Sequence, residues 1–161
     1  MKCLYIFLIV AVCLASCSRS HVAIKDEEIP EENFILPDEL EPFTGECLVF
    51  YSGSKAIKER MTFKSGKLNG PMISYYSNGN IKRKGEFING LMEGTWQSWY
   101  LDGKIKYTAF YQKDTLNGQY SEWYKTGVLK EKGLYALNKP VGKWIEYDEA
   151  GMIIKTKEFK Y

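Results

Sequence analysis

Cysteine and histidine, the residues best suited to nucleophilic or metal chemistry, are nearly confined to the start of this chain. Its 161 residues include four cysteines and one histidine. Three of the cysteines lie within the first 17 residues, His21 follows them, and only Cys47 lies farther along. Residues 43–161 therefore cannot build a Ser-His-Asp or Cys-His centre, a disulfide framework or a CxxC metal site. We expect no enzyme, no cofactor and no bound metal.

The one cysteine with a chemical context is Cys17. Met1–Cys17 begins with a single lysine, continues as an apolar run and ends in Leu14-Ala15-Ser16-Cys17. The run is shorter than the roughly 20 residues of a membrane-spanning helix, and it is typical of a secretory signal. Its end resembles the lipobox of bacterial lipoproteins, although an ordinary signal peptide is the alternative. The resemblance implies a signal peptide over residues 1–16 and a lipid on Cys17. It also implies a place in the bacterial cell envelope, at the outer membrane (periplasmic or surface side) rather than the inner membrane.

Residues 17–42 read as an acidic tether. They hold eight acids and three prolines but few apolar residues, so they cannot bury enough surface to offset the entropy of ordering. We expect this segment to be extended or disordered. Residues 43–161 carry 19 Lys and Arg against 12 Asp and Glu, which leaves peripheral contact with anionic lipid open as a function.

A unit of 24 residues recurs through the remainder of the chain. Its copies begin at Gly70, Gly94, Gly118 and Gly142, and a degenerate copy spans residues 45–69. We number each copy from its first glycine, which is position 0. Positions 8 and 9 are Asn-Gly in the first of the four copies and Asp-Gly in the second, a strong signal for a two-residue hairpin turn. Because the links between copies are short, we expect an all-β fold: tandem antiparallel hairpins in one elongated, twisted, single-layer meander. The copies span 70–93, 94–117, 118–141 and 142–161.

A two-residue turn would place position 2 opposite 15, position 0 opposite 17 and position 6 opposite 11. Large rings then lie opposite glycine or alanine, as in Trp96 opposite Ala109, and each ring can cover the backbone of its partner. We call this side the glycine–ring face. In the degenerate copy, Cys47 faces Met61 with the sizes exchanged, which predicts a packing role for the thiol. One pair argues against this register, because Glu122 faces Glu131.

The second face carries the candidate binding residues. The expected register places an aromatic ring at position 5 opposite position 12, which is lysine in three copies. The resulting stripe comprises Tyr75, Trp99, Trp123 and Tyr147 with Lys82, Lys106 and Lys130, and position 14 adds Lys84 and Lys132. Such a stripe could bind sugars or anionic groups, or it could simply stabilise the sheet by packing lysine stems on rings.

The pattern of Gly94, Trp96, Trp99, Tyr100 and Gly103, repeated in phase, closely resembles the bacterial variant of the membrane occupation and recognition nexus (MORN) repeat. The resemblance covers residues 45–161 and implies tandem hairpins that do interaction work without shared catalytic residues. The family also includes proteins described as YwqK-type antitoxins, although a secretory signal is at odds with neutralising a cytoplasmic toxin. We therefore expect a membrane-anchored, non-catalytic binding or scaffold module that recognises a protein or an envelope polymer. We expect no nucleic-acid partner, and either a monomer or a face-to-face homodimer.

Overall fold

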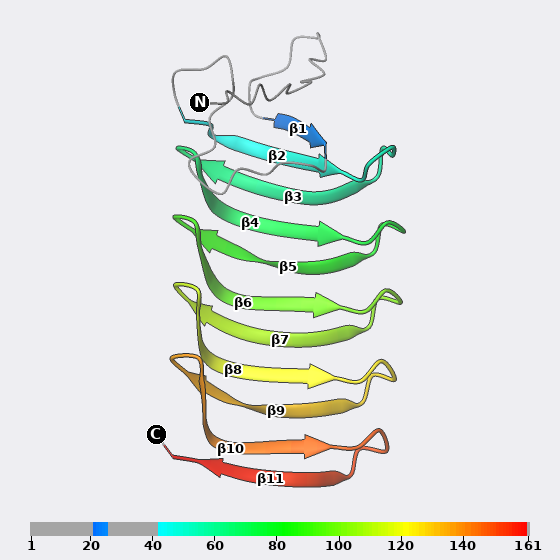
Figure 1. Cartoon of the computed structure of the whole chain (residues 1–161), viewed down its shortest axis with the longest axis vertical. Helices are drawn as coiled ribbons and strands as arrows, with labels where there is room; N and C mark the ends of the chain where they lie inside the picture. Colours follow the sequence, from blue (N-terminus) through cyan, green and yellow to red (C-terminus); the bar gives the residue numbers. More distant parts are fainter. Residues whose placement is uncertain (1–20, 26–41, 161) are drawn as a thin grey trace, which may run out of the picture.

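The computed structural model describes residues 21–25 and 42–160 and places them in one open, eleven-stranded sheet (Figure 1). The strands follow each other across the sheet in chain order, which confirms the predicted all-β meander. They are β1 (His21–Lys25), β2 (Gly45–Phe50), β3 (Ile57–Lys64), β4 (Lys67–Tyr75), β5 (Ile81–Ile88), β6 (Leu91–Trp99), β7 (Ile105–Gln112), β8 (Thr115–Trp123), β9 (Leu129–Ala136), β10 (Lys139–Tyr147) and β11 (Ile153–Phe159). The described residues contain no helix long and apolar enough to cross a bilayer.

Strand β1 is an element that sequence reasoning missed. It pairs in parallel with β2, with His21 opposite Glu46 and Lys25 opposite Phe50, whereas β2 to β11 form antiparallel pairs. The expectation of a disordered tether over residues 17–42 is therefore wrong for this strand. The signal peptide, Cys17 and residues 26–41 lie outside the described part of the chain.

The hairpin turns differ from the predicted two-residue type. At the first regular turn only Gly79 has positive φ, at 87°. Its N–H donates to the carbonyl of Tyr76 at 2.9 Å, and the N–H of Tyr76 donates to the carbonyl of Asn80 at 2.8 Å. This is a three-residue loop in which a type I turn is followed by a left-handed glycine. The same bonds recur around Gly103, Gly127 and Gly151.

Two-residue turns with positive φ at both residues instead join one repeat to the next. Asn89-Gly90 links β5 to β6, with φ of 52° and 85°, and Ile88 pairs directly with Leu91. Ser65-Gly66, Lys113-Asp114 and Leu137-Asn138 make the equivalent links. This tight geometry keeps successive hairpins side by side.

The three-residue hairpin loop shifts the strand register at the end of each repeat that lies next to the loop. Pairing is as predicted from position 0 to position 4, including Gly94 with Tyr111, Trp96 with Ala109 and the like-charged pair Glu122–Glu131. Trp99, however, pairs with Ile105 rather than Lys106, because the residue at position 12 is the extra residue of a β-bulge. The other position 5 residues pair likewise: Tyr75 with Ile81, Trp123 with Leu129 and Tyr147 with Ile153. The predicted pairing of position 5 with 12, and of position 6 with 11, is thus wrong.

The glycine–ring face holds most of the buried side chains. At its N-terminal end Phe43, Cys47, Val49, Met61 and Phe63 form one apolar cluster. Cys47 and Met61 are cross-strand partners, as predicted, and burial followed by the charge of Glu59 raises the pKa of the thiol to about 11. Because the sheet is a single layer, these side chains are covered by neighbours on the same face rather than by a second sheet; Figure 1 shows the single row of bowed strands.

Rings do cover glycines on this face, but they come from the next repeat. A Cβ on Gly85 would overlap the ring of Trp96, and a Cβ on Gly133 would overlap the ring of Trp144. The predicted covering of each glycine by its own cross-strand partner is therefore wrong, although those pairs are formed. The aromatic–glycine contact fastens one hairpin to its neighbour rather than closing a hairpin on itself.

Candidate functional site

The predicted aromatic residues do share the second face of the sheet. Tyr75, Trp99, Trp123 and Tyr147 occupy the end of strands β4, β6, β8 and β10, and each is half-buried. Successive rings lie two strands apart, which is about 10 Å at the usual strand spacing. Exposed apolar side chains continue this surface, with Phe110 40% and Leu134 41% exposed. The face thus presents a regular row of partly accessible rings and aliphatic groups.

The predicted lysines lie elsewhere. Lys82 is 5.9 Å from the ring of Tyr76, and Lys106 is 5.8 Å from the ring of Tyr100; both tyrosines belong to the glycine–ring face. Lys130 makes a 3.2 Å ion pair with Glu122 on that same face. The bulge at position 12 is the reason, since a slip of one residue sends a side chain to the opposite face.

The lysines that do accompany the second-face rings come from position 14 of the preceding repeat. Lys84 lies 6.0 Å from the ring of Trp99, and Lys132 lies 6.0 Å from the ring of Tyr147. The candidate site on the second face therefore consists of the four rings with Lys84 and Lys132. The other three lysines of the predicted stripe are separate from it.

A further row of tyrosines, at position 6, connects the repeats. The hydroxyl of Tyr76 donates to the carbonyl of Trp99 at 2.7 Å, and Tyr100 donates to Trp123 at 2.7 Å. Tyr51 and Tyr124 make the same bond to Tyr75 and Tyr147. Asp148 occupies position 6 in the final repeat, where no next repeat follows within the described residues. The sequence contained this signal, a tyrosine present in every copy except the last, but pairing within single hairpins obscured it.

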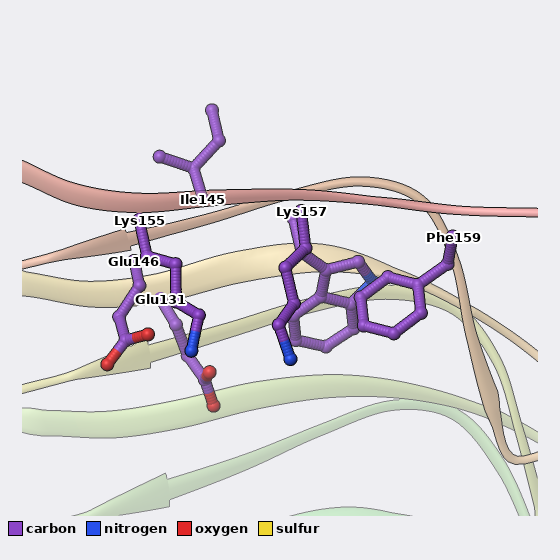
Figure 2. Close-up of a pocket in the computed structure, with 7 residues that line it drawn as sticks. Glu131, Ile145, Glu146, Lys155, Lys157 and Phe159 are labelled. Atoms are coloured by element: carbon purple, nitrogen blue, oxygen red, sulfur yellow. The ribbon is translucent and has the colours of Figure 1, made fainter.

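The glycine–ring face also carries a continuous line of cross-strand neighbours, which we call the polar row. From β3 to β11 it consists of Glu59, Ser74, Arg83, Ser98, Tyr107, Glu122, Glu131, Glu146 and Lys155. Three successive carboxylates lie near its C-terminal end, where a shallow pocket is bordered by Glu131, Trp144 and Glu146. Figure 2 shows Glu131, Glu146 and Lys155 on one side of the sheet, with Ile145 pointing to the other.

Glu131 should make the fold less stable at neutral pH. Burial, and then the charge of Glu122, raise the pKa of Glu131 above its ordinary value. A raised pKa in the folded state means that stability falls as pH rises from the ordinary pKa of a glutamate through the raised one. We expect Glu131→Gln to raise the melting temperature at pH 7 and to leave it unchanged at pH 3.5, by calorimetry. The exposed Glu149→Gln is the control, and an equal melting temperature at pH 7 for Glu131→Gln and the unaltered chain would contradict the expectation.

Comparison with known proteins identifies the repeat. The family described as MORN repeat variant matches residues 68–89, 92–113, 116–136 and 140–161, which together make up more than half of the chain. No curated protein is significantly similar to the chain. Within the described residues, no group of three or more His, Cys, Asp or Glu is placed to hold a metal ion.

Proposed function

Because the chain belongs to the MORN repeat variant family and leaves one face of its sheet open, we propose that it is a non-catalytic binding module. The row of half-buried rings on the second face carries the proposal. The glycine–ring face holds most of the buried side chains, whereas the second face repeats a Tyr or Trp in each regular copy beside exposed aliphatic groups. Tyrosine and tryptophan dominate the binding energy of protein interfaces, so a protein is the partner that this surface suits best.

The module would be held at the bacterial cell envelope by a lipid on Cys17. In that case β1 would limit the distance between the sheet and the membrane, because His21 begins the strand only four residues after Cys17. Four residues span at most about 14 Å, so the sheet would lie close to the membrane surface instead of standing off on a long tether. The N-terminal edge of the sheet would face the lipid and the repeats would extend away from it.

The division of the lysines between two faces weighs against the alternative of a lipid-binding surface. Lys82 and Lys106 lie over tyrosine rings of the glycine–ring face and so do not add to the charge of the second face. Fewer cations then remain on the second face to attract anionic lipid, to which each would contribute about 1 kcal/mol near the surface.

The binding proposal is tested with a photo-crosslinking amino acid at Phe110, which is exposed on the second face. We expect it to capture a discrete protein in cells, and we expect Trp99→Ala with Trp123→Ala to reduce the yield at least about tenfold, since each hot-spot ring contributes about 2 kcal/mol. Lys84→Glu with Lys132→Glu tests the same face without removing packed rings. A second-face site requires that this charge reversal also lowers the yield.

The matched control carries Lys125→Ala and Glu149→Ala, two exposed turn residues, and should crosslink normally. Undiminished capture by both the ring and the lysine variants would overturn the proposal. Capture of an envelope polymer in place of a protein would show that the rings serve polymer recognition, and the protein assignment would then be wrong.

A further inference from the structure

Among the described residues, Arg83 on β5 has no anionic partner. Its guanidinium carbon lies 4.3 Å from the centroid of the Trp96 ring, and one terminal nitrogen is 3.7 Å from the sulfur of Met92, a weak acceptor. The Nε atom is buried and makes no hydrogen bond to residues 21–25 or 42–160. No carboxylate among the described residues forms an ion pair with this side chain.

A second donor is unsatisfied beside it. The Nε1 atom of Trp96 is buried and finds no hydrogen-bond partner within the described part of the chain, and the whole residue is only 1% exposed. Buried polar groups are nearly always hydrogen-bonded, because leaving one unmade costs about 1–3 kcal/mol. Two unsatisfied donors in one ring–guanidinium stack indicate a site that would take a hydrogen-bond acceptor from a ligand.

The other repeats show that the fold does not need an arginine here. Arg83 occupies position 13, and the same position is Glu59, Tyr107, Glu131 or Lys155 in the other copies. Positions that hold the sheet together are far more uniform: position 17, for example, is Phe or Tyr in every copy. The five copies therefore act as an internal control, and they separate Arg83 from the residues that build the hairpin.

The surroundings of Arg83 are basic. Its neighbours in the polar row are Ser74 and Ser98, and Lys82 and Lys106 project to the same face over their tyrosines. The nearest carboxylates along the row are Glu59 on one side, beyond Ser74, and Glu122 on the other, beyond Ser98 and Tyr107. This section of the glycine–ring face thus gathers three cations.

We propose that Arg83 marks a binding site for the carboxylates of an acidic peptide segment. A guanidinium presents a planar fork that matches a carboxylate in two parallel hydrogen bonds. The side chain is only half-buried, so an extended peptide chain can reach its exposed part. The site is distinct from the second-face row, and the proposal does not depend on the partner proposed for that row.

The test uses the full chain and a fluorescently labelled hexaglutamate peptide, with binding followed by anisotropy and by the indole N–H resonance of Trp96. We expect Arg83→Gln to weaken binding at least about tenfold, since a charge-assisted hydrogen bond contributes about 1.5–3 kcal/mol. Arg83→Lys keeps the charge but loses the fork and should restore only part of the affinity. Lys125→Gln, at an exposed turn residue, is the matched charge-removing control and should bind normally.

Equal binding by Arg83→Gln, equal loss in Lys125→Gln, or an unmoved Trp96 resonance would each overturn the proposal. So would Arg83-dependent binding to phosphatidylglycerol vesicles without binding to hexaglutamate, because the ligand would then be a lipid phosphate. Residues 26–41 of the chain are themselves acidic and could compete. Hexaglutamate binding that appears only after Asp26, Glu27 and Glu28 are neutralised would support the site and identify the competitor.

Discussion

Replacing Trp96 by alanine should lower the free energy of unfolding by about 3–5 kcal/mol, the usual cost of truncating a fully buried aromatic residue. The side chain is 1% exposed and covers the backbone of Gly85. It meets Phe87 edge-to-face at 5.1 Å and Tyr111 at 6.4 Å. The substitution would open a cavity between two hairpins and uncover a glycine, so both neighbouring repeats should loosen.

Trp99 is the matched comparison, because it lies three residues along the same strand on the opposite face. It is half-buried, so Trp99→Ala should cost clearly less than Trp96→Ala, about 1–2 kcal/mol by the area that it buries. Urea denaturation measures the difference. Hydrogen exchange should locate the loss for Trp96→Ala in β5 to β7, since each repeat is stabilised mainly by its neighbours. Equal losses for the two variants would contradict the separation of a structural face from a binding face.

The part of each repeat far from the hairpin loop could be predicted from sequence because side-chain size is informative there. A ring opposite a glycine or alanine has few other acceptable registers, and Trp96 does pair with Ala109. The loop end carries less information. Asp102-Gly103 is compatible with a two-residue turn and with a three-residue loop, because both accept a glycine with positive φ. Because the two-residue turn was predicted, Lys106 was assigned to the second face, whereas it lies on the glycine–ring face.

Contacts between repeats were harder to predict than contacts within them. The tyrosine–carbonyl bonds join positions 23 or 24 residues apart, as in Tyr100 to Trp123, and the strand pairing of one hairpin says nothing about them. The parallel pairing of β1 with β2 is equally non-local. Arg83 could not be predicted as a site from the repeat pattern, because it differs from the residues at the same position of the other copies and the predicted site consisted of residues that recur.

Cys17→Ser should release the protein from the membrane fraction almost completely. If Cys17 is lipidated as proposed, its two or more acyl chains would give stable anchoring, and replacing the cysteine would remove that attachment. Incorporation of a clickable palmitate analogue should fall to background in the same variant. Cys13→Ser, within the preceding apolar run, is the control and should keep both the label and the membrane location.

The Cys17→Ser variant also tests whether folding of the sheet depends on the anchor. Because β1 pairs with β2 through its backbone, the released protein should retain slow amide exchange at residues 21–25 and an unchanged melting temperature. A labelled Cys17→Ser protein that stayed in the membrane fraction would place the attachment elsewhere and contradict lipidation at this cysteine. If release also abolished protection of β1, the strand would depend on the membrane, and the anchor would then contribute to the fold as well as to its location.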